Sequence, residues 1–250
     1  MRALITGASS GMGADMARVL ASMGYDLILV ARRKSRLDRL KKELDVNVEV
    51  ISMDLGSSFN CVKLYNEVKN MDIDILINNA GFGAFGEFDK TNMDKELDMI
   101  DLNIKAVHIL TKLFLNDFKK KNRGYILNVA SSAGFMPGPL MATYYGTKAY
   151  VLNLTQAINE ELRRSNSNVY VGALCPGPVD TEFNKVAKVH FEVKSLDSYE
   201  VSKYAIKGMF KKKMLIIPGL QMKLAIFFSR FVPRRTLLKI TYNIQKAKRS

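Results

Sequence analysis

Cysteine and histidine are scarce in this sequence of 250 residues, which contains two of each. Cys61 and Cys175 lie far apart, one in a predicted helix and one at a predicted strand end, so they indicate neither a disulfide framework nor a metal site. His108 and His190 have no acid–base partners at motif spacing, and we expect both to be structural. We therefore predict a protein without a bound metal, in a reducing compartment.

Long apolar runs are missing as well. No run reaches the roughly 18 residues that a transmembrane helix needs. Met1 and Arg2 lead directly into a predicted strand, so we expect no signal peptide. The sequence also lacks linkers, low-complexity tracts and internal repeats. These absences predict one domain in a cytoplasmic protein.

Acidic residues are missing from the end of the chain. Residues 201–250 contain thirteen Lys or Arg and no Asp or Glu, while the whole chain has a net charge of +14, so the first 200 residues carry a net charge of only +1. Apolar residues alternate with the basic ones over 220–250, a pattern that suits an anionic membrane surface, at the inner face of the membrane. The alternative is a pair of helices that packs on the body or on a second subunit. No nucleic-acid motif accompanies the charge, so we expect no nucleic-acid partner.

Strand-like and helical segments alternate along the rest of the chain. This alternation predicts an α/β fold, a Rossmann-type doubly wound parallel sheet with helices on both faces. We expect a cofactor-binding and catalytic part over 1–219, with a substrate segment at 182–198, and a basic extension of the same domain over 220–250. The expected strands are 3–6, 27–30, 48–51, 73–77, 125–129 and 169–174, with one more strand and a helical pair after residue 211.

A glycine-rich turn follows the first predicted strand. Gly7, Gly11 and Gly13 let the backbone approach a ligand closely, and the next helix offers its free N–H groups to a pyrophosphate. The spacing is G-x-x-x-G-x-G rather than the common G-x-G-x-x-G. At the end of the second strand, where a carboxylate would select NAD, the chain has Arg32 and Arg33. We therefore predict NADP(H), with Arg32 as the first candidate for the 2′-phosphate and Arg33 as the second.

Tyr144 and Lys148 are four residues apart, so on a helix they share one face. A nearby ammonium favours a phenolate, and we expect Lys148 to lower the pKa of Tyr144 enough for proton transfer near neutral pH. Tyr145 lies three residues from Lys148 and competes for the same role. Ser131 and its neighbour Ser132 are both candidates to bind a carbonyl oxygen.

These features together resemble the classical short-chain dehydrogenase/reductase family over residues 1–181. The resemblance implies Asn103, Ser131, Tyr144 and Lys148 as the catalytic set, and it selects Ser131 and Tyr144 over their neighbours by the family's spacing. It also implies a cofactor site built from Thr6, Gly7, Ser9, Ser10, Gly11, Met12, Gly13, Arg32, Arg33, Asp54, Leu55, Asn79, Ala80, Gly81, Tyr144, Lys148, Pro176, Gly177, Val179 and Thr181.

The resemblance implies a role for each key residue. Ser131 polarises the substrate carbonyl, Tyr144 exchanges the proton, Lys148 also binds the nicotinamide ribose, and Asn103 holds a water that links Lys148 to solvent. Asp54 binds the adenine, Asn79 to Gly81 pass beneath its ribose, and Thr181 binds the carboxamide. Homodimers or homotetramers are frequent in the family, and we expect one of these.

The expected substrate is an apolar ketone, aldehyde or alcohol. Apolar residues predicted at the mouth of the site are Phe82, Phe85, Phe135, Met136, Pro137, Met141, Phe183, Val186, Val189, Phe191 and Val193. The predicted function is therefore NADP(H)-dependent hydride transfer between nicotinamide and a carbonyl or alcohol. The alternative is a non-catalytic NADP(H)-binding sensor or a membrane-associated scaffold.

Overall fold

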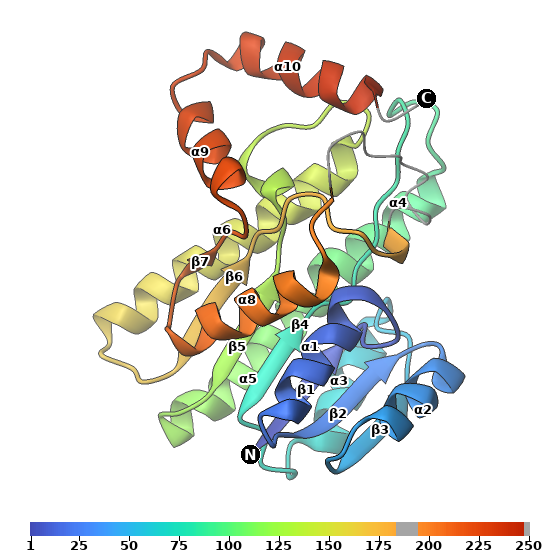
Figure 1. The fold of residues 1–250 in the computed structure, drawn as a ribbon, viewed down its shortest axis with the longest axis vertical. Coiled ribbons are helices and arrows are strands. Elements are labelled where there is room, and N and C mark those ends of the chain that lie inside the picture. The colour runs from blue at the N-terminus through green and yellow to red at the C-terminus, as the bar shows by residue number, and fades with distance from the viewer. Residues whose placement is uncertain (184–194, 248–250) are drawn as a thin grey trace.

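The computed structural model describes residues 1–183 and 195–247. Its centre is a seven-stranded sheet in the order β3-β2-β1-β4-β5-β6-β7, in which every neighbouring pair is parallel (Figure 1). The strands are β1 (Arg2–Thr6), β2 (Asp26–Ala31), β3 (Val48–Ser52), β4 (Ile75–Asn78), β5 (Tyr125–Val129), β6 (Tyr170–Leu174) and β7 (Leu215–Ile216). The predicted α/β fold with a doubly wound parallel sheet is confirmed.

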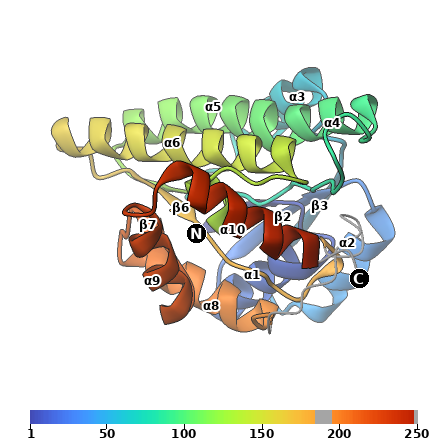
Figure 2. The same cartoon turned by 90° about the horizontal axis from the view of Figure 1, so that it is seen from above.

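Helices cover both faces of this sheet, as Figure 2 shows. They are α1 (Gly11–Ser22), α2 (Lys34–Glu43), α3 (Ser58–Val68), α4 (Met93–Ile100), the π-helix η1 (Asp101–Ala106), α5 (Val107–Lys121), the 3-10 helix η2 (Ser132–Phe135), α6 (Ala142–Arg164) and α8 (Ser198–Phe210). Alternate strand residues point to opposite faces. Ile5 and Leu29 pack with α1, α2 and α8, whereas Leu4 and Ile28 pack with α3 and α5. Because both faces are buried, the strands read as continuous apolar runs.

The order of the sheet reverses beside β1. The chain builds β2 and β3 on one side of β1, and then crosses to build β4, β5, β6 and β7 on the other side. At such a switch point the two connections leave the carboxyl edge in opposite directions, and a crevice forms between them. The glycine-rich turn after β1 and the segment after β4 both lie at this crevice.

The tail consists of β7, which is the last strand of the sheet, and of α9 (Leu220–Ser229) and α10 (Arg234–Lys246), so the predicted strand and helical pair are present. Its two helices stand above the carboxyl edge of the sheet (Figure 1). Helix α10 starts at Arg234, earlier than the apolar run beginning at Leu237 indicated, because the fixed φ of Pro233 suits a helix start. Ile226, Thr241 and Gln245 are buried, so the tail packs on the body. None of the described helices is long and apolar enough to cross a membrane.

Candidate active site

A cavity of about 1170 Å³ lies at the carboxyl edge of the sheet, between the crevice and the tail. Most of the predicted site residues line it, namely Gly7, Ser9, Ser10, Gly11, Met12, Arg32, Arg33, Asp54, Leu55, Asn79, Ala80, Gly81, Ser131, Tyr144, Lys148, Pro176, Gly177, Val179 and Thr181. The other three, Thr6, Gly13 and Asn103, support the wall from behind through the contacts described below. The structure thus gathers residues from seven separate parts of the sequence.

The glycine-rich turn is fixed to the end of β4. Thr6 Oγ1 accepts hydrogen bonds from the N–H groups of Asn79 and Ala80 at 3.0 and 3.1 Å, and Asn79 Nδ2 donates to the carbonyl oxygens of Thr6 and Gly7 at 3.0 and 3.2 Å. A Cβ at Gly13 would lie 2.4 Å from Gly7 O and 2.5 Å from Asn79 Nδ2. Glycine is therefore required for α1 to begin this close to the turn, with its N-terminus facing the cavity.

Arg33 lies across the glycine-rich turn. Its guanidinium donates to Ser9 Oγ at 3.1 Å and to Ser10 Oγ at 3.0 Å, and it forms an ion pair with Glu182 Oε2 at 3.0 Å. Arg36, which the motif reasoning missed, pairs with Glu182 Oε1 at 2.6 Å. Hydrogen bonds from Arg36 and then Arg33 hold the pKa of Glu182 down at about 2. Two guanidinium groups therefore converge on one anion beside the turn.

Arg32 takes a different direction. Its side chain is 72% exposed, and its guanidinium lies 3.8 Å from Asp54 Oδ2. Asp54 Oδ1 in turn accepts the N–H of Gly56 at 3.0 Å. Both arginines line the cavity, but only Arg33 is tied to the turn that faces the α1 N-terminus.

Ser131, Tyr144 and Lys148 meet at the centre of the cavity wall. Ser131 follows β5, and its Oγ accepts the N–H of Ala133 at 3.1 Å. The Ser131 hydroxyl lies near enough to the Tyr144 phenol to lower the pKa of that phenol. Tyr144 and Lys148 occupy the first turns of α6, with Lys148 Nζ 5.9 Å from the centre of the Tyr144 ring. Lys148 Nζ donates to Val129 O at 2.8 Å. A helix and a strand end thereby bring a hydroxyl, a phenol and an ammonium into one small region.

The acid–base balance of this region differs from the prediction. Burial raises the pKa of Tyr144 to about 12, and the Ser131 hydroxyl offsets only part of that rise. Burial also lowers the pKa of Lys148 to about 8. The predicted lowering of the Tyr144 pKa by Lys148 is therefore wrong for this structure, because the ammonium bonds to the Val129 carbonyl and desolvation dominates both groups. Tyr144 keeps its proton at neutral pH, which is the form that an acid needs.

Asn103 lies in the π-helix η1 and is 1% exposed. Its Nδ2 donates to Phe82 O at 2.9 Å and to Thr147 Oγ1 at 3.1 Å, and its Oδ1 accepts the Phe82 N–H at 3.1 Å. Thr147 Oγ1 donates to Tyr144 O at 2.7 Å. A Cβ on Gly81 would lie 2.8 Å from Asn103 Oδ1 and 3.6 Å from Lys148 Nζ. The π-helix, a feature frequent at functional sites, thus sets Asn103 between the backbone of Phe82 and helix α6.

The apolar mouth is confirmed in part. Phe82, Met136, Met141 and Phe183 line the cavity, and the Phe183 ring lies 5.3 Å from the Tyr144 ring. Phe85, Phe135 and Pro137 are not among its lining residues; Phe135 packs instead against the core cluster formed by α6 and β6. Val186, Val189, Phe191, Val193 and most of the predicted substrate segment lie outside the described residues, as does His190.

The tail forms the roof of the cavity, a contribution that the motifs did not reveal. From α9 it supplies Met222, Ala225, Phe228 and Ser229, then Val232, and from α10 Leu237, Ile240, Thr241, Ile244 and Gln245. These residues lie on one face of each helix. Gln245 Nε2 donates a hydrogen bond to the hydroxyl of Tyr145, the neighbour of Tyr144. The helical spacing of these residues was readable in the sequence, but their target 100 residues away was not.

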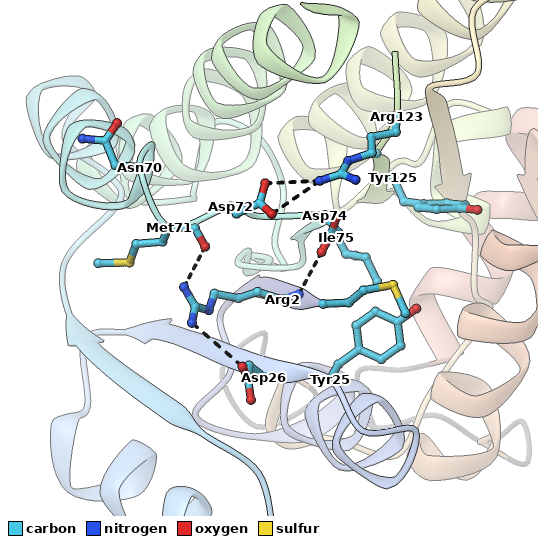
Figure 3. Close-up of a pocket in the computed structure, with 12 residues that line it drawn as sticks. Arg2, Tyr25, Asp26, Asn70, Met71, Asp72, Asp74, Ile75, Arg123 and Tyr125 are labelled. Atoms are coloured by element: carbon cyan, nitrogen blue, oxygen red, sulfur yellow. Dashed lines mark hydrogen bonds and ion pairs between the residues drawn. The ribbon is translucent and has the colours of Figure 1, made fainter. Parts of the chain in front are cut away.

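A second hollow, of about 670 Å³, lies at the amino edge of the sheet (Figure 3). Its charged residues bind one another. The Arg2 guanidinium donates to Met71 O at 2.6 Å and lies 3.9 Å from Asp26, while the Arg2 N–H donates to Asp74 at 3.0 Å. Arg123 pairs with an aspartate on the same rim. The arginines of this hollow are thus engaged with carboxylates and a carbonyl oxygen of the hollow itself.

Metal chemistry has no support in the part of the chain that the structure describes. No group of His, Cys, Asp or Glu there is placed to hold a metal ion. Cys61 and Cys175 are buried and unlinked. The His108 ring bonds to the Tyr150 hydroxyl at 2.6 Å on the surface, as a structural residue would.

A family model described as short chain dehydrogenase matches residues 1–192. The chain belongs to the short-chain dehydrogenase family. The solved structure of a short-chain dehydrogenase from Sphingobium yanoikuyae in complex with NADPH is 34% identical and has a TM-score of 0.82, with coverage of 92% of this chain and 93% of that chain. A bulky-bulky ketone specific alcohol dehydrogenase from Comamonas testosteroni is 32% identical, with a TM-score of 0.78 and coverage of 92% of each chain.

Among curated proteins, this short-chain dehydrogenase is 35% identical over 201 residues to a very-long-chain 3-oxoacyl-CoA reductase from Phaeosphaeria nodorum. The match covers 74% of the present chain and 57% of that protein. Family membership makes the protein an oxidoreductase with a nicotinamide cofactor. The cavity fits such a cofactor, since glycine-only contacts shape the turn at one end and the Ser131, Tyr144 and Lys148 cluster lies at the other.

Proposed function

We propose that this short-chain dehydrogenase is an NADP(H)-dependent carbonyl reductase for apolar substrates. One observation carries the proposal: Ser131, Tyr144 and Lys148 line the same cavity as Arg33 and the glycine-rich turn. A single ligand can therefore reach both the phosphate-binding end and the proton donor.

The proton step follows from the side chains. The cofactor, when bound, would supply hydride to the carbonyl carbon. Ser131 would donate a hydrogen bond to the carbonyl oxygen, which polarises it. Tyr144, held protonated by burial, would then transfer its phenolic proton to that oxygen and complete the alcohol. Lys148, with its pKa lowered to about 8, stabilises the resulting phenolate and can return a proton to it near neutral pH. Asn103 positions this part of α6 through Thr147.

The cofactor preference rests on arginine and on the lack of an acid after β2. Arg33 is better placed than Arg32 for a 2′-phosphate, because its guanidinium already binds the hydroxyls of the glycine-rich turn. We therefore reverse the order that the sequence suggested, with Arg32 as the second ligand. The Glu182 carboxylate forms ion pairs with Arg33 and Arg36. A bound 2′-phosphate would compete with this carboxylate for the two guanidinium groups. The NADPH complex of the Sphingobium protein supports the same choice.

The substrate class follows from the roof. Phe228, Ile240 and Ile244 face the cavity, and yet they are 58%, 44% and 51% exposed. An apolar substrate would cover these side chains and gain roughly 25 cal/mol for each Å² of apolar surface removed from water. The ketone-specific and very-long-chain acyl relatives act on substrates of this kind according to their names, which supports the proposal.

The rival function, a non-catalytic cofactor sensor or scaffold, is disfavoured by the complete set of Asn103, Ser131, Tyr144 and Lys148. A dimer or tetramer, the cytoplasmic location and the membrane association of the tail remain predictions. The division into 1–219 and 220–250 is likewise a proposal, and the roof makes the second part a portion of the substrate site.

A panel of carbonyl compounds tests this function directly. Oxidation of NADPH should be fast with bulky or long-chain ketones and aldehydes, and slow with sugars and small polar ketones. NADH should support much lower catalytic efficiency. Tight NADPH binding without turnover of any carbonyl would favour the sensor, and equal efficiency with both cofactors would refute the NADP(H) preference.

A further inference from the structure

Helix α9 has two apolar sides. Its inner side lines the cavity with Met222, Ala225 and Phe228. Its other side carries an outer stripe, which we define as Leu220, Leu224, Phe227 and Phe231. These four side chains are 71%, 48%, 51% and 72% exposed. The Phe227 and Phe231 rings lie 5.5 Å apart, so the stripe continues into the turn after α9.

An exposed group of four large apolar residues is costly in water unless something covers it. Isolated exposed residues such as Phe59 occur elsewhere on this protein and need no explanation. The outer stripe differs because its members are neighbours at helical spacing. Core packing does not account for it either, since the inner side of the same helix already faces the body.

The charge around the outer stripe identifies its occupant. Arg230, Arg234 and Arg235 follow the helix and are exposed, and residues 201–250 contain no acidic residue. A second copy of this chain would oppose one strongly basic surface to another, which costs free energy. An anionic lipid surface offers the opposite charge together with an apolar layer beneath it. It also requires no matching shape from the stripe.

We propose that the outer stripe and its flanking arginines dock this protein on an anionic membrane surface. Phe227 and Phe231 enter the boundary between headgroups and acyl chains, while Arg230, Arg234 and Arg235 bind headgroup phosphates. Figure 1 shows α9 and α10 at the far end from the amino edge of the sheet, so docking here leaves the rest of the body in water.

Docking in this way would place the cavity next to the bilayer. Helix α9 is the wall between them, with one side to the lipid and one side to the substrate space. Apolar carbonyl compounds partition into membranes, so the enzyme would collect its substrate where that substrate accumulates. Only this consequence rests on the proposed function; the docking itself does not.

Co-sedimentation of the full chain with vesicles tests the docking. The protein should bind vesicles of phosphatidylcholine with phosphatidylglycerol, should not bind phosphatidylcholine alone, and should be released by salt. The double variant Phe227→Ser/Phe231→Ser should bind at least tenfold more weakly. Its control, Phe59→Ser/Phe88→Ser, removes two phenylalanines elsewhere that are 76% and 69% exposed, and it should bind as the wild type does.

A charge variant gives an independent measurement. Arg234→Gln/Arg235→Gln should weaken binding by about 25-fold, at about fivefold for each charge near the surface. Lys41→Gln/Lys42→Gln on α2 is the matched control and should have no effect. NADPH binding by each variant confirms that it is folded. Salt-independent binding to both vesicle types would overturn the proposal, and so would a wild-type protein that ignores vesicles and dimerises through the stripe. Vesicle binding needs no substrate, so its failure is distinguishable from failure of the reductase activity.

Discussion

The two edges of one sheet use charge in opposite ways. At the amino edge, Arg2 and Arg123 lie near solvent, and each has a carboxylate partner. At the carboxyl edge, Lys148 is 6% exposed and its ammonium bonds to a neutral carbonyl oxygen. Both edges have a hollow large enough for a ligand, about 670 Å³ at the amino edge and about 1170 Å³ at the carboxyl edge, so the presence of a cavity does not distinguish them. The useful difference is that a buried charge without an ionic partner lowers the stability of the fold, and function is the ordinary reason to retain it.

The largest test of this comparison removes the proton donor from the carboxyl edge. Tyr144→Phe should lower kcat by about 10²–10⁴, because general acid catalysis is lost while the cavity keeps its shape. NADPH affinity should stay within a few-fold. Tyr145→Phe is the matched control: it breaks the contact with Gln245 in the roof, so it should raise KM for bulky substrates and leave kcat within about tenfold. Equal losses of kcat in Tyr144→Phe and Tyr145→Phe would contradict the assignment of Tyr144, rather than Tyr145, as the proton donor.

Lys148→Met tests the energetic side of the comparison. The folded-state pKa of Lys148 is about 8 and its ordinary value is 10.5. Below pH 8 the ammonium is charged in both states, and its burial penalises the fold by about 3 kcal/mol. Between pH 8 and 10.5 the unfolded chain binds more protons, so the stability of the wild type rises and the penalty disappears.

The variant should therefore abolish turnover and yet unfold at higher urea concentration than the wild type at pH 7. Removing the burial penalty of about 3 kcal/mol stabilises the variant, but the Val129 carbonyl loses its hydrogen-bond partner, so the expected net gain in the free energy of unfolding is about 2 kcal/mol. This gain should shrink as the pH approaches 10.5. Lys41→Met, at an exposed position, should show no such pH dependence. A variant that is less stable at pH 7 would mean that the lysine is a structural residue like those of the amino edge.

Arg33→Ala sharpens the comparison within the carboxyl edge. The charge-assisted hydrogen bonds of the Arg33 guanidinium to a 2′-phosphate contribute roughly 1.5–3 kcal/mol to binding. Without them, the Kd for NADPH should rise about tenfold or more, while the Kd for NADH changes little. Arg32→Ala should have a smaller effect, since that side chain is mostly exposed. Titration of both cofactors by fluorescence measures each constant. A larger effect at Arg32 would restore the order predicted from the sequence.

The smallest effect is expected at the amino edge. Arg123→Gln removes an exposed ion pair with Asp72, which keeps Lys121 as a partner at 2.7 Å. The free energy of unfolding should change by less than about 0.5 kcal/mol, and turnover and NADPH binding should be unchanged. Loss of either activity would mean that the hollow of Figure 3 is linked to the active site, and the contrast between the edges would fail.

Much of the site was predictable because its parts are local. The glycines at 7, 11 and 13 follow a strand directly, and the four-residue spacing of Tyr144 and Lys148 needs only a helix. The strands were predictable too, because each is a short continuous run of apolar residues, as burial on both faces of the sheet requires.

The features that were not predictable depend on distant contacts. Arg33 turns toward Ser10 partly because Glu182, 149 residues away in the chain, accepts a hydrogen bond from the other terminal nitrogen of its guanidinium. The high pKa of Tyr144 depends on how completely the fold buries it, which no spacing reveals. The π-helix around Asn103 and the Gln245 contact to the catalytic helix have the same origin in tertiary packing.

The roof has a consequence for how this enzyme can diversify. The most deeply buried residues of α10 are the polar Thr241 and Gln245, whereas its apolar Ile240 and Ile244 stay half covered. Gln245 anchors the helix through its hydrogen bond to the Tyr145 hydroxyl, whereas Thr241 bonds to carbonyl oxygens of its own helix. The apolar side chains can therefore change without loss of the Gln245 contact. None of the reacting groups lies in the tail. Substitutions in α9 and α10 should thus change which molecules enter the cavity, while the proposed reacting groups, Ser131, Tyr144 and Lys148, stay in place.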